Sequence, residues 1–369
     1  MKIFLCTTAS CKFQKSWSNI PFFLNQFLVK YGFNVENIVL KESSVPAFLY
    51  NGFFRIFRKI IKSQSTYFYS RTKFHFFLMR LYGTYIKYIS AKEDIILQQG
   101  YSFSLKNGKN KVILFGDWPY AYYFNKFAKR LPNQYEIRSI FREDKVIENA
   151  DAVVTLFPDV YDFMTSRYQN KNIFYFGNVV NVDVLIPSDI LSTKVVSKKI
   201  IFIGKEHYLS GALELIDAVN KVQKCMGNIH LDIVGIPSKL IHQNYPWLTV
   251  HGYLNKDDPR QRSVYYDLLK NARVFVNPTR GWNAFQATLE AMFFSCPIIV
   301  RENVNLRKTF PFLENFSYLI DDSSALVDCL QLCLKDQELF KSKSLSASAT
   351  SSLHTWDYFM GQLTKKVLQ

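Results

Sequence analysis

The polar residues best suited to bind a ligand follow an apolar run in the C-terminal half of the chain. The run ends at Pro278, Arg280 and Gly281 come next, and a helix is predicted to begin near Gln286, with Glu290 one turn inside it. A carboxylate in that place can accept hydrogen bonds from the two hydroxyls of a ribose. The loop amides and the start of the helix would face a diphosphate. The spacing therefore indicates a nucleotide site.

A second turn with phosphate-binding character lies upstream. Residues 200–203 read as a buried strand that runs into Gly204-Lys205, and Ser210-Gly211 opens a helix. Glycine lets a backbone approach a phosphate closely, and a helix start offers unpaired N–H groups. The same pattern is common as plain punctuation between a strand and a helix, so both interpretations stay open. In the binding interpretation, Lys205 and Arg280 are candidate catalytic residues, because they would meet the negative charge that develops on a leaving diphosphate.

Residues 275–300 resemble the retaining glycosyltransferases of the GT-B fold, family 4 type (glycosyl transferases group 1). In that family a strand and a proline precede Glu-x7-Glu, which ends in Glu-Ala-Met and is followed by a small residue, a proline and another strand. Glu290-Ala291-Met292 and Pro297 match this pattern. Residues 148–154 resemble the last helix and strand of the family's N-terminal domain, and residues 177–181 resemble its hinge.

The resemblance also implies which residues bind the donor. Gly204-Lys205 resembles the family's phosphate loop, and residues 252–254 resemble the strand end beside the nucleobase. The donor-binding residues implied in this way are Gly204, Lys205, Ser210, Gly252, Tyr253, Leu254, Phe285, Gln286, Ala287 and Glu290.

The chain departs from the family pattern where the sugar would lie. The first Glu of Glu-x7-Glu falls on Trp282, and the lysine that usually precedes the helix glycine is Ser210. The N-terminal loop, residues 7–10, lacks the family's glycine pair. Where the family often has a histidine after a mid-sheet strand, this chain has Asp117, which is a candidate catalytic residue or a helix cap. These departures leave a non-catalytic GT-B-like scaffold as an alternative.

The histidines and acids show no pattern of a metal site. The six histidines form no His-x-His or His-Glu-x-x-His spacing, and Asp-x-Asp is absent, which disfavours the metal-dependent transferase fold. We therefore expect no metal and no cofactor, with the nucleotide-sugar donor acting as a substrate.

The net charge of +16 is concentrated in part of the N-terminal half. Residues 43–92 contain no Asp or Glu but many basic and aromatic residues. At helical period one face holds Phe53, Phe57, Ile60 and Ile61, and the other largely holds Arg55, Arg58, Lys59 and Lys62. Such a helix is typical of contact with an anionic membrane surface or a lipid-linked acceptor. The alternative is a helix that packs its apolar face on the domain core. No nucleic-acid motif accompanies the segment, so we expect no nucleic-acid partner.

Short apolar runs alternate with helical stretches along the 369 residues, which predicts parallel sheets covered by helices on both faces. The polar stretch 188–199 interrupts the alternation and reads as a linker. We expect an α/β chain of two Rossmann-like domains, with residues 1–187 binding the acceptor and residues 200–350 the nucleotide sugar. The resemblance implies that the domains face each other across a cleft. It also implies that a helix in residues 351–369 returns towards the N-terminal domain.

The apolar runs are shorter than the ~18–20 residues that a transmembrane helix needs, and the N-terminal one is too short for a signal peptide. We therefore expect a cytoplasmic protein that is peripheral on the inner face of the membrane. The resemblance implies transfer of a sugar, with retention, from a nucleotide-diphosphate sugar to a glycan or lipid-linked acceptor. Bacterial surface polysaccharide synthesis is the expected role. A second alternative is a protein whose main role is to bind a membrane surface.

Overall fold

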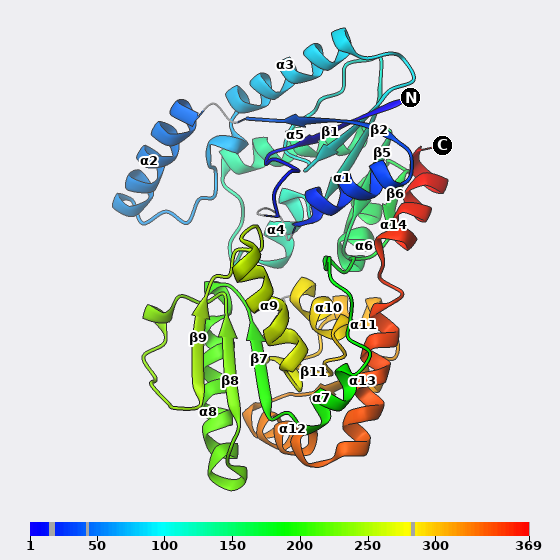
Figure 1. Ribbon diagram of the computed structural model, residues 1–369. Coiled ribbons are helices and arrows are strands. Elements are labelled where there is room, and N and C mark those ends of the chain that lie inside the picture. The colour runs from blue at the N-terminus through cyan, green and yellow to red at the C-terminus, as the bar shows by residue number, and fades with distance from the viewer. Residues whose placement is uncertain (15–18, 42–43, 282–284, 369) are drawn as a thin grey trace. The chain divides into compact units, whose positions relative to one another are not determined.

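The computed structural model describes residues 1–14, 19–41, 44–281 and 285–368. Contacts within the chain divide it into two compact units, whose elements are drawn in Figure 1. The first unit contains Ile20–Gly177 with the N-terminal strand and Phe359–Gln369, and the second contains Asn178–Tyr358.

The first unit is built on a parallel sheet of six strands in the order β2-β1-β3-β4-β5-β6. Its central strands are buried nearly throughout, as expected for a parallel sheet with helices on its faces. The strands are β1 (Lys2–Thr7), β2 (Asn34–Val39), β3 (Ile95–Gln99), β4 (Lys111–Gly116), β5 (Ala152–Thr155) and β6 (Ile173–Tyr175). The helices are α1 (Ile20–Lys30), α2 (Ser44–Ile60), α3 (Lys73–Ile89), α4 (Tyr120–Lys126), α5 (Gln134–Glu148) and α6 (Pro158–Arg167), with a short 3-10 turn, η2 (Tyr69–Arg71).

The second unit has its own parallel sheet of six strands, in the order β12-β11-β10-β7-β8-β9. Counted within the unit, this is the 3-2-1-4-5-6 order of a Rossmann fold. The strands are β7 (Lys199–Ile203), β8 (His230–Val234), β9 (Leu248–Gly252), β10 (Val274–Asn277), β11 (Ile298–Val300) and β12 (Ser317–Leu319). The helices are α7 (Ile190–Val196), α8 (Leu209–Met226), α9 (Pro259–Asn271), α10 (Phe285–Phe293), α11 (Val304–Thr309), α12 (Ser323–Lys335) and α13 (Gln337–Ser351). The last helix, α14 (Trp356–Leu363), begins in this unit and belongs to the first unit from Phe359 onwards. The prediction of two Rossmann-like α/β domains is confirmed.

Local sequence explains how the helices of the second unit form. Leu215, Val219 and Val222 recur at helical spacing on α8, and all three are fully buried in the core of the unit. Helix α9 begins at Pro259, and the Asp258 side chain accepts hydrogen bonds from the next free amides. This combination of an aspartate cap and a first-turn proline is favourable because it satisfies amides that have no partner inside the helix.

The end of the chain belongs to the first unit, as expected. The Phe359 ring packs edge-on against Phe115 of β4, with ring centres 5.8 Å apart, and against Phe176 at 5.7 Å. The Lys111 ammonium donates a hydrogen bond to the Val367 carbonyl. These contacts bury residues that follow Tyr358 and hold them on the N-terminal sheet.

The stretch 188–199, predicted to be a linker, is folded. It contains α7 and the first residue of β7. The Lys194 side chain is fully buried, and its ammonium donates to the Leu269 carbonyl at 2.7 Å and to the Ala272 carbonyl. The polar composition of residues 188–199 was misleading, because Lys194 satisfies carbonyls at the end of α9 instead of reaching solvent. The boundary between the units lies earlier than predicted, after Gly177.

Candidate functional site

The topology of the second sheet marks one edge as the natural place for a ligand. Strands β7 and β10 are neighbours, but the chain leaves them in opposite directions across the sheet, so β7 and β10 flank a topological switch point. Ligands of open α/β sheets bind beyond the carboxyl ends of the strands at such a point. Gly204-Lys205 follows β7 and residues 278–280 follow β10, so both predicted phosphate loops belong to this edge.

The two loops touch through a glycine. A Cβ atom on Gly211, in the first turn of α8, would lie 2.1 Å from Thr279 Oγ1 and 2.9 Å from the Thr279 amide nitrogen. Only glycine permits that approach. Among the described residues, Thr279 Oγ1 and Asn277 Nδ2 are buried without a hydrogen-bond partner. Orphaned polar groups beside a helix N-terminus are suited to bind the oxygens of an anion.

The ends of β7, β8 and β9 are also packed backbone to backbone. The Gly235 amide donates to the Gly252 carbonyl at 2.7 Å, and a Cβ atom on Gly235 would lie 2.5 Å from the Gly204 carbonyl oxygen. Gly252 has a positive φ of 65°, and Tyr253, which follows it, is exposed. The predicted residues Gly252, Tyr253 and Leu254 therefore lie on the same edge as Gly204.

The candidate catalytic bases of this unit are exposed. Lys205 precedes the 3-10 turn η3 (Glu206–Tyr208), and Ser210 is exposed in the first turn of α8. Arg280 is exposed next to Gly281, which has a positive φ of 88°. Both basic side chains can therefore reach a ligand at the strand ends. Trp282, which takes the place of the family's first Glu, lies outside the described residues.

A residue that the sequence did not single out holds this loop. The Arg301 side chain is buried and donates to the Pro278 carbonyl at 2.7 Å, to Glu214 of α8 at 2.6 Å, and to the Asp321 carbonyl. It thus connects the end of β10 to α8 and to the segment after β12. A base directly after a predicted strand was the only signal available for it.

Glu290 occupies a closed polar cluster. Its carboxylate is 2% exposed and accepts from Lys256 Nζ at 2.8 Å and 2.7 Å and from the Tyr265 hydroxyl at 2.5 Å. The Lys256 ammonium also lies 4.1 Å from the centre of the Tyr265 ring. Burial and the Glu290 charge raise the pKa of Tyr265 well above its usual value. Lys256 and Tyr265 were missed by sequence reasoning, because nothing in their spacing relates them to Glu290.

The other predicted donor residues of α10 have structural contacts. Phe285 is buried and stacks on Phe310, with ring centres 5.8 Å apart and planes at 11°. Gln286 Nε2 donates to the Val179 carbonyl at 2.9 Å, and Ala287 is buried. Their side chains fix the start of α10, and any contact of theirs with a donor remains a prediction.

Asp117 lies in the other unit, directly after β4. Its carbonyl accepts a hydrogen bond from the Thr155 hydroxyl at 2.9 Å. The N-cap of α4 is Pro119, so Asp117 lies two residues before the cap position. Burial raises the pKa of Tyr101 well above its usual value, and the Asp117 charge adds to the effect. A catalytic role for Asp117 stays a prediction.

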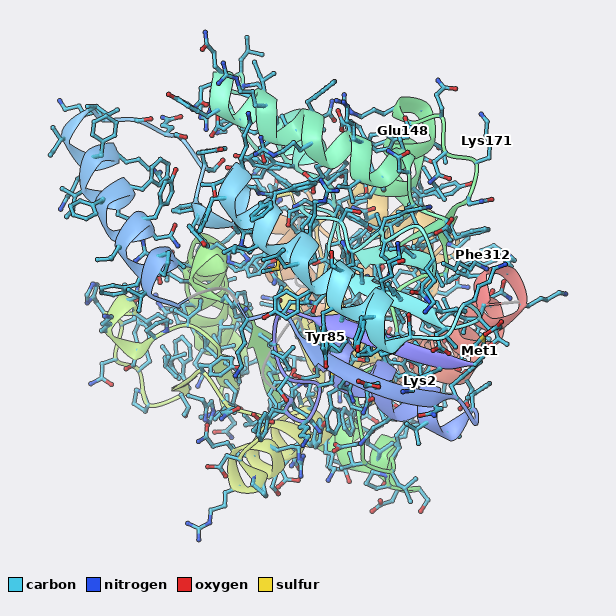
Figure 2. The ribbon with its side chains drawn as sticks, turned by 90° about the horizontal axis from the view of Figure 1, so that it is seen from above. Met1, Lys2, Tyr85, Glu148, Lys171 and Phe312 are labelled. Atoms are coloured by element: carbon cyan, nitrogen blue, oxygen red, sulfur yellow. The ribbon has the colours of Figure 1, made fainter. Side chains whose placement is uncertain are left out.

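The basic helix of the first unit is α2, and its apolar face does not pack on the core. It projects from the rest of its unit in Figures 1 and 2. It is tied to the unit along one stripe, where Asn51 accepts a hydrogen bond from the Tyr69 amide at 2.9 Å and Phe54 packs on Phe68. The predicted apolar residues Phe53, Phe57, Ile60 and Ile61 are all exposed. The core-packing alternative is therefore wrong for α2.

The bases of α2 are not equivalent. Arg55 and Lys59 are exposed, and so is Lys62, which lies beyond the end of the helix at Ile60. Arg58 is half-buried, donates to the Ser63 carbonyl at 3.3 Å and lies over the rings of Phe54 and Phe68. Helix α3 adds a second exposed apolar stripe, near Tyr85 in Figure 2, that consists of Phe74, Phe77, Leu81, Tyr85 and Tyr88.

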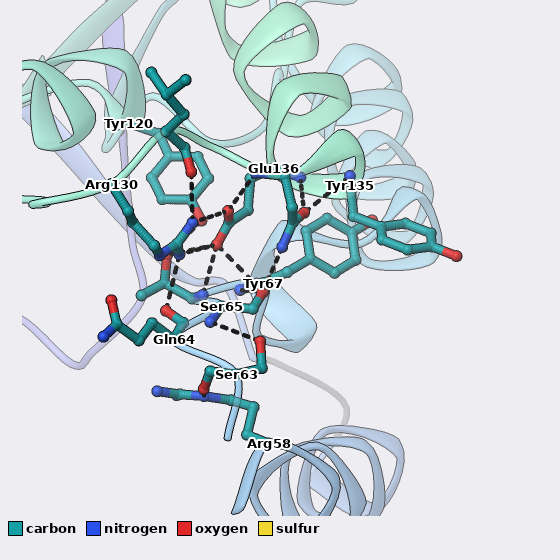
Figure 3. Close-up of polar contacts among 12 residues, drawn as sticks. Arg58, Ser63, Gln64, Ser65, Tyr67, Tyr120, Arg130, Tyr135 and Glu136 are labelled. Carbon is teal, nitrogen blue, oxygen red and sulfur yellow. Dashed lines mark hydrogen bonds and ion pairs between the residues drawn. The ribbon is translucent and has the colours of Figure 1, made fainter. Parts of the chain in front are cut away.

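The segment that follows α2 is fixed by one carboxylate, as Figure 3 shows. Glu136, at the start of α5, is fully buried and accepts from both terminal nitrogens of Arg130 at 2.7 Å. It also accepts from the Thr66 amide at 2.6 Å, the Asn133 amide at 2.9 Å and the Ser65 hydroxyl at 3.2 Å. Burial alone would raise the pKa of Glu136, but these bonds outweigh it and lower the pKa to about 2.

In the described part of the chain, no group of three or more His, Cys, Asp or Glu side chains could hold a metal ion. No helix within it is both long and apolar enough to cross a bilayer.

One protein-family model matches most of the second unit. Residues 197–336 match the family model for Glycosyl transferases group 1. This range includes strands β7 to β12 and all of the predicted donor residues. No curated protein sequence matches the chain.

Solved structures resemble the chain at low identity. Sucrose-phosphate synthase from Thermosynechococcus elongatus is 13% identical with a TM-score of 0.66, and the match covers 100% of this chain and 99% of that one. WaaG, a glycosyltransferase involved in lipopolysaccharide biosynthesis, is 13% identical with a TM-score of 0.64, covering 99% and 98%. TarM is 15% identical with a TM-score of 0.59; the match covers 78% of this chain but only 58% of TarM. Identities this low show the fold alone. The chain thus has the GT-B fold, and its residues 197–336 match the glycosyl transferases group 1 model.

Proposed function

We propose that this protein is a glycosyltransferase that moves a sugar from a nucleotide-diphosphate sugar to a glycan or lipid-linked acceptor. One observation carries the proposal. The group 1 match spans a Rossmann-like sheet whose switch point brings two phosphate-type loops into contact, through Gly211 and Thr279. Such an edge suits a nucleotide diphosphate.

The donor half offers the groups that stabilise a leaving diphosphate. Thr279 and Asn277 supply polar groups without partners beside the start of α8, and Lys205 and Arg280 supply positive charge. These charges would act most strongly where negative charge grows in the transition state. We propose that Lys205 and Arg280, together with Asp117 of the first unit, are the catalytic residues.

Retention of configuration and the hexosyl class follow the resemblance of residues 275–300 to the family 4 pattern. Synthesis of a bacterial surface polysaccharide is the role we propose, and the likeness to WaaG, described as acting in lipopolysaccharide biosynthesis, supports it. A non-catalytic scaffold is the rival, because Trp282 replaces the first Glu of the family pattern.

A thermal-shift panel of UDP-, GDP- and other nucleotide-diphosphate sugars tests the donor site. A ligand at 100 times its Kd adds about 2.7 kcal/mol to the stability of the folded state, enough to raise Tm by several degrees. The donor that shifts Tm is then incubated with the purified protein to detect its hydrolysis or transfer. Binding without turnover favours the scaffold, and no shift with any donor refutes the proposal.

We propose in addition that α2 and α3 dock the protein on the inner, anionic face of the cytoplasmic membrane. Phe48 and Phe53 are 78% and 72% exposed, and they lie on α2 with Arg55 and Lys59. Apolar side chains can enter the interface while each nearby base contributes on the order of 1 kcal/mol on an anionic leaflet. This placement would bring a lipid-linked acceptor to the first unit.

Sedimentation with vesicles tests the docking. The protein should bind vesicles that contain anionic phospholipid, bind neutral ones much less, and be released as salt rises. Changing Arg55, Arg58, Lys59 and Lys62 together to Gln should abolish binding and leave the donor thermal shift intact. The matched control changes four exposed lysines of the second unit, Lys221, Lys224, Lys239 and Lys335, to Gln and should keep binding. Equal binding to both vesicle types refutes the proposal.

A further inference from the structure

The Lys256–Glu290 pair changes what the predicted ribose site can do. A carboxylate has about four sites for accepting hydrogen bonds. Glu290 already uses three of them, two for Lys256 and one for Tyr265. It therefore retains one acceptor site, whereas a ribose presents two adjacent hydroxyls.

Lys256 can supply the hydrogen bond that Glu290 lacks for the second ribose hydroxyl. An ammonium has three N–H groups, and Lys256 directs hydrogen bonds to the two oxygens of Glu290, which leaves one donor. Its side chain is 13% exposed against 2% for Glu290, so the lysine is the more accessible member of the pair. The loop that carries Lys256 directly follows Gly252-Tyr253-Leu254 at the end of β9, where the nucleobase is predicted to lie.

Lys256 is also held too firmly to be displaced by a neutral diol. It is paired with both oxygens of a buried carboxylate and lies over the Tyr265 ring. Removing one member of a buried ion pair leaves the other charge uncompensated, which is strongly unfavourable. Ribose hydroxyls carry no charge and would not compensate Glu290 for the loss.

We propose that Lys256 is a specificity-determining residue for the donor and binds one ribose hydroxyl while Glu290 binds the other. The lysine donates to the oxygen of one hydroxyl, and the remaining acceptor site of Glu290 receives the proton of its neighbour. Each hydroxyl thus forms a hydrogen bond with a different charged group. The inference rests on the proposed donor site and adds the residue that distinguishes a ribose from a deoxyribose.

Calorimetry with nucleoside diphosphates tests this assignment. The probes are UDP and GDP with their 2′-deoxy and 3′-deoxy forms. The wild type should prefer each ribonucleotide over both deoxy forms by roughly 10- to 100-fold, the value of a hydrogen bond to a charged group. Lys256→Met should reduce the preference at one hydroxyl to less than about threefold and keep the preference at the other. An unchanged pair of ratios in Lys256→Met overturns the inference.

Two further variants separate specificity from stability. Tyr265→Phe removes a partner of Glu290 that is not assigned to the ribose. Affinity should therefore change by the same factor for the ribonucleotide and for its 2′-deoxy and 3′-deoxy forms. Lys256→Met combined with Glu290→Gln removes the uncompensated charge, so it should fold even if the single variant does not, and it should still lose the preference assigned to Lys256. A wild type that binds no nucleoside diphosphate refutes the proposed function itself, whereas a wild type with preferences that no Lys256 variant alters refutes only this inference.

Discussion

Replacing Glu136 by Gln removes the charge that holds residues 63–67 against α5. The isosteric amide would turn its NH2 group towards the donors of Arg130 and Thr66, which now reach the carboxylate at 2.7 Å and 2.6 Å. The pKa of Glu136 is lowered from 4.5 to about 2. At about 1.4 kcal/mol for each tenfold change in proton affinity, folding gains about 3 kcal/mol from this carboxylate at neutral pH.

The pH dependence follows from the direction of that shift. Because the folded-state pKa is the lower one, the contribution is complete above pH 4.5 and is lost as the pH falls towards 2. The stability difference between the wild type and Glu136→Gln should therefore be about 3 kcal/mol at pH 7 and shrink progressively below pH 4.5.

Urea unfolding at pH 7, 4 and 3 measures the difference, and hydrogen exchange locates it. Amides in residues 63–72 should exchange faster in Glu136→Gln, while those of α8, in the other unit, keep their rates. Glu93→Gln, an exposed acid of the same unit, is the control and should change neither quantity. A difference below 1 kcal/mol at pH 7, or one that stays constant down to pH 3, would refute the role assigned to Glu136.

Three further predictions concern the second unit. Glu290→Ala should weaken binding of the donor found in the thermal-shift panel by roughly tenfold or more, as measured by calorimetry. It should also lower the free energy of unfolding by about 3–5 kcal/mol, because Lys256 loses its buried partner. Unchanged donor affinity would contradict the assigned site. Gly211→Ala should lower both Tm and donor affinity, because the added Cβ would lie 2.1 Å from Thr279 Oγ1. The control is Gly361→Ala, whose added Cβ would meet no atom within 4 Å, so its free energy of unfolding should stay within about 1 kcal/mol of the wild type. Equal Tm values in the two variants would argue against the close contact. Lys205→Ala and Arg280→Ala should each reduce turnover at least about tenfold with Tm unchanged, since both side chains are exposed; full activity in either variant would remove that residue from the site.

The parallel strands were predictable because their signal is local. Strand β7 was expected at residues 200–203 and is found at Lys199–Ile203, and β10 was expected at 274–276 and is found at Val274–Asn277. Buried parallel strands are continuous apolar runs, so few residues suffice to recognise them. Strand β12 (Ser317–Leu319) and helix α13 went unpredicted, because β12 is a short strand that begins with a serine and α13 has almost no apolar periodicity.

The sequence alone determined the two α/β halves and the basic, amphipathic character of residues 43–92, whereas the close contacts of Gly211 and Gly235 appear only in the structure. Periodicity along α2 shows that one face is apolar, but whether another element covers that face depends on segments far away in the chain. Only the tertiary structure decided that Phe53 is exposed and that Lys194 is buried. It also decided that Glu290 is shared between Lys256 and Tyr265, which lie 34 and 25 residues away in the sequence. Such partners meet only when the sheet and its loops have folded, because ion pairing depends on distance in space and leaves no spacing in the sequence.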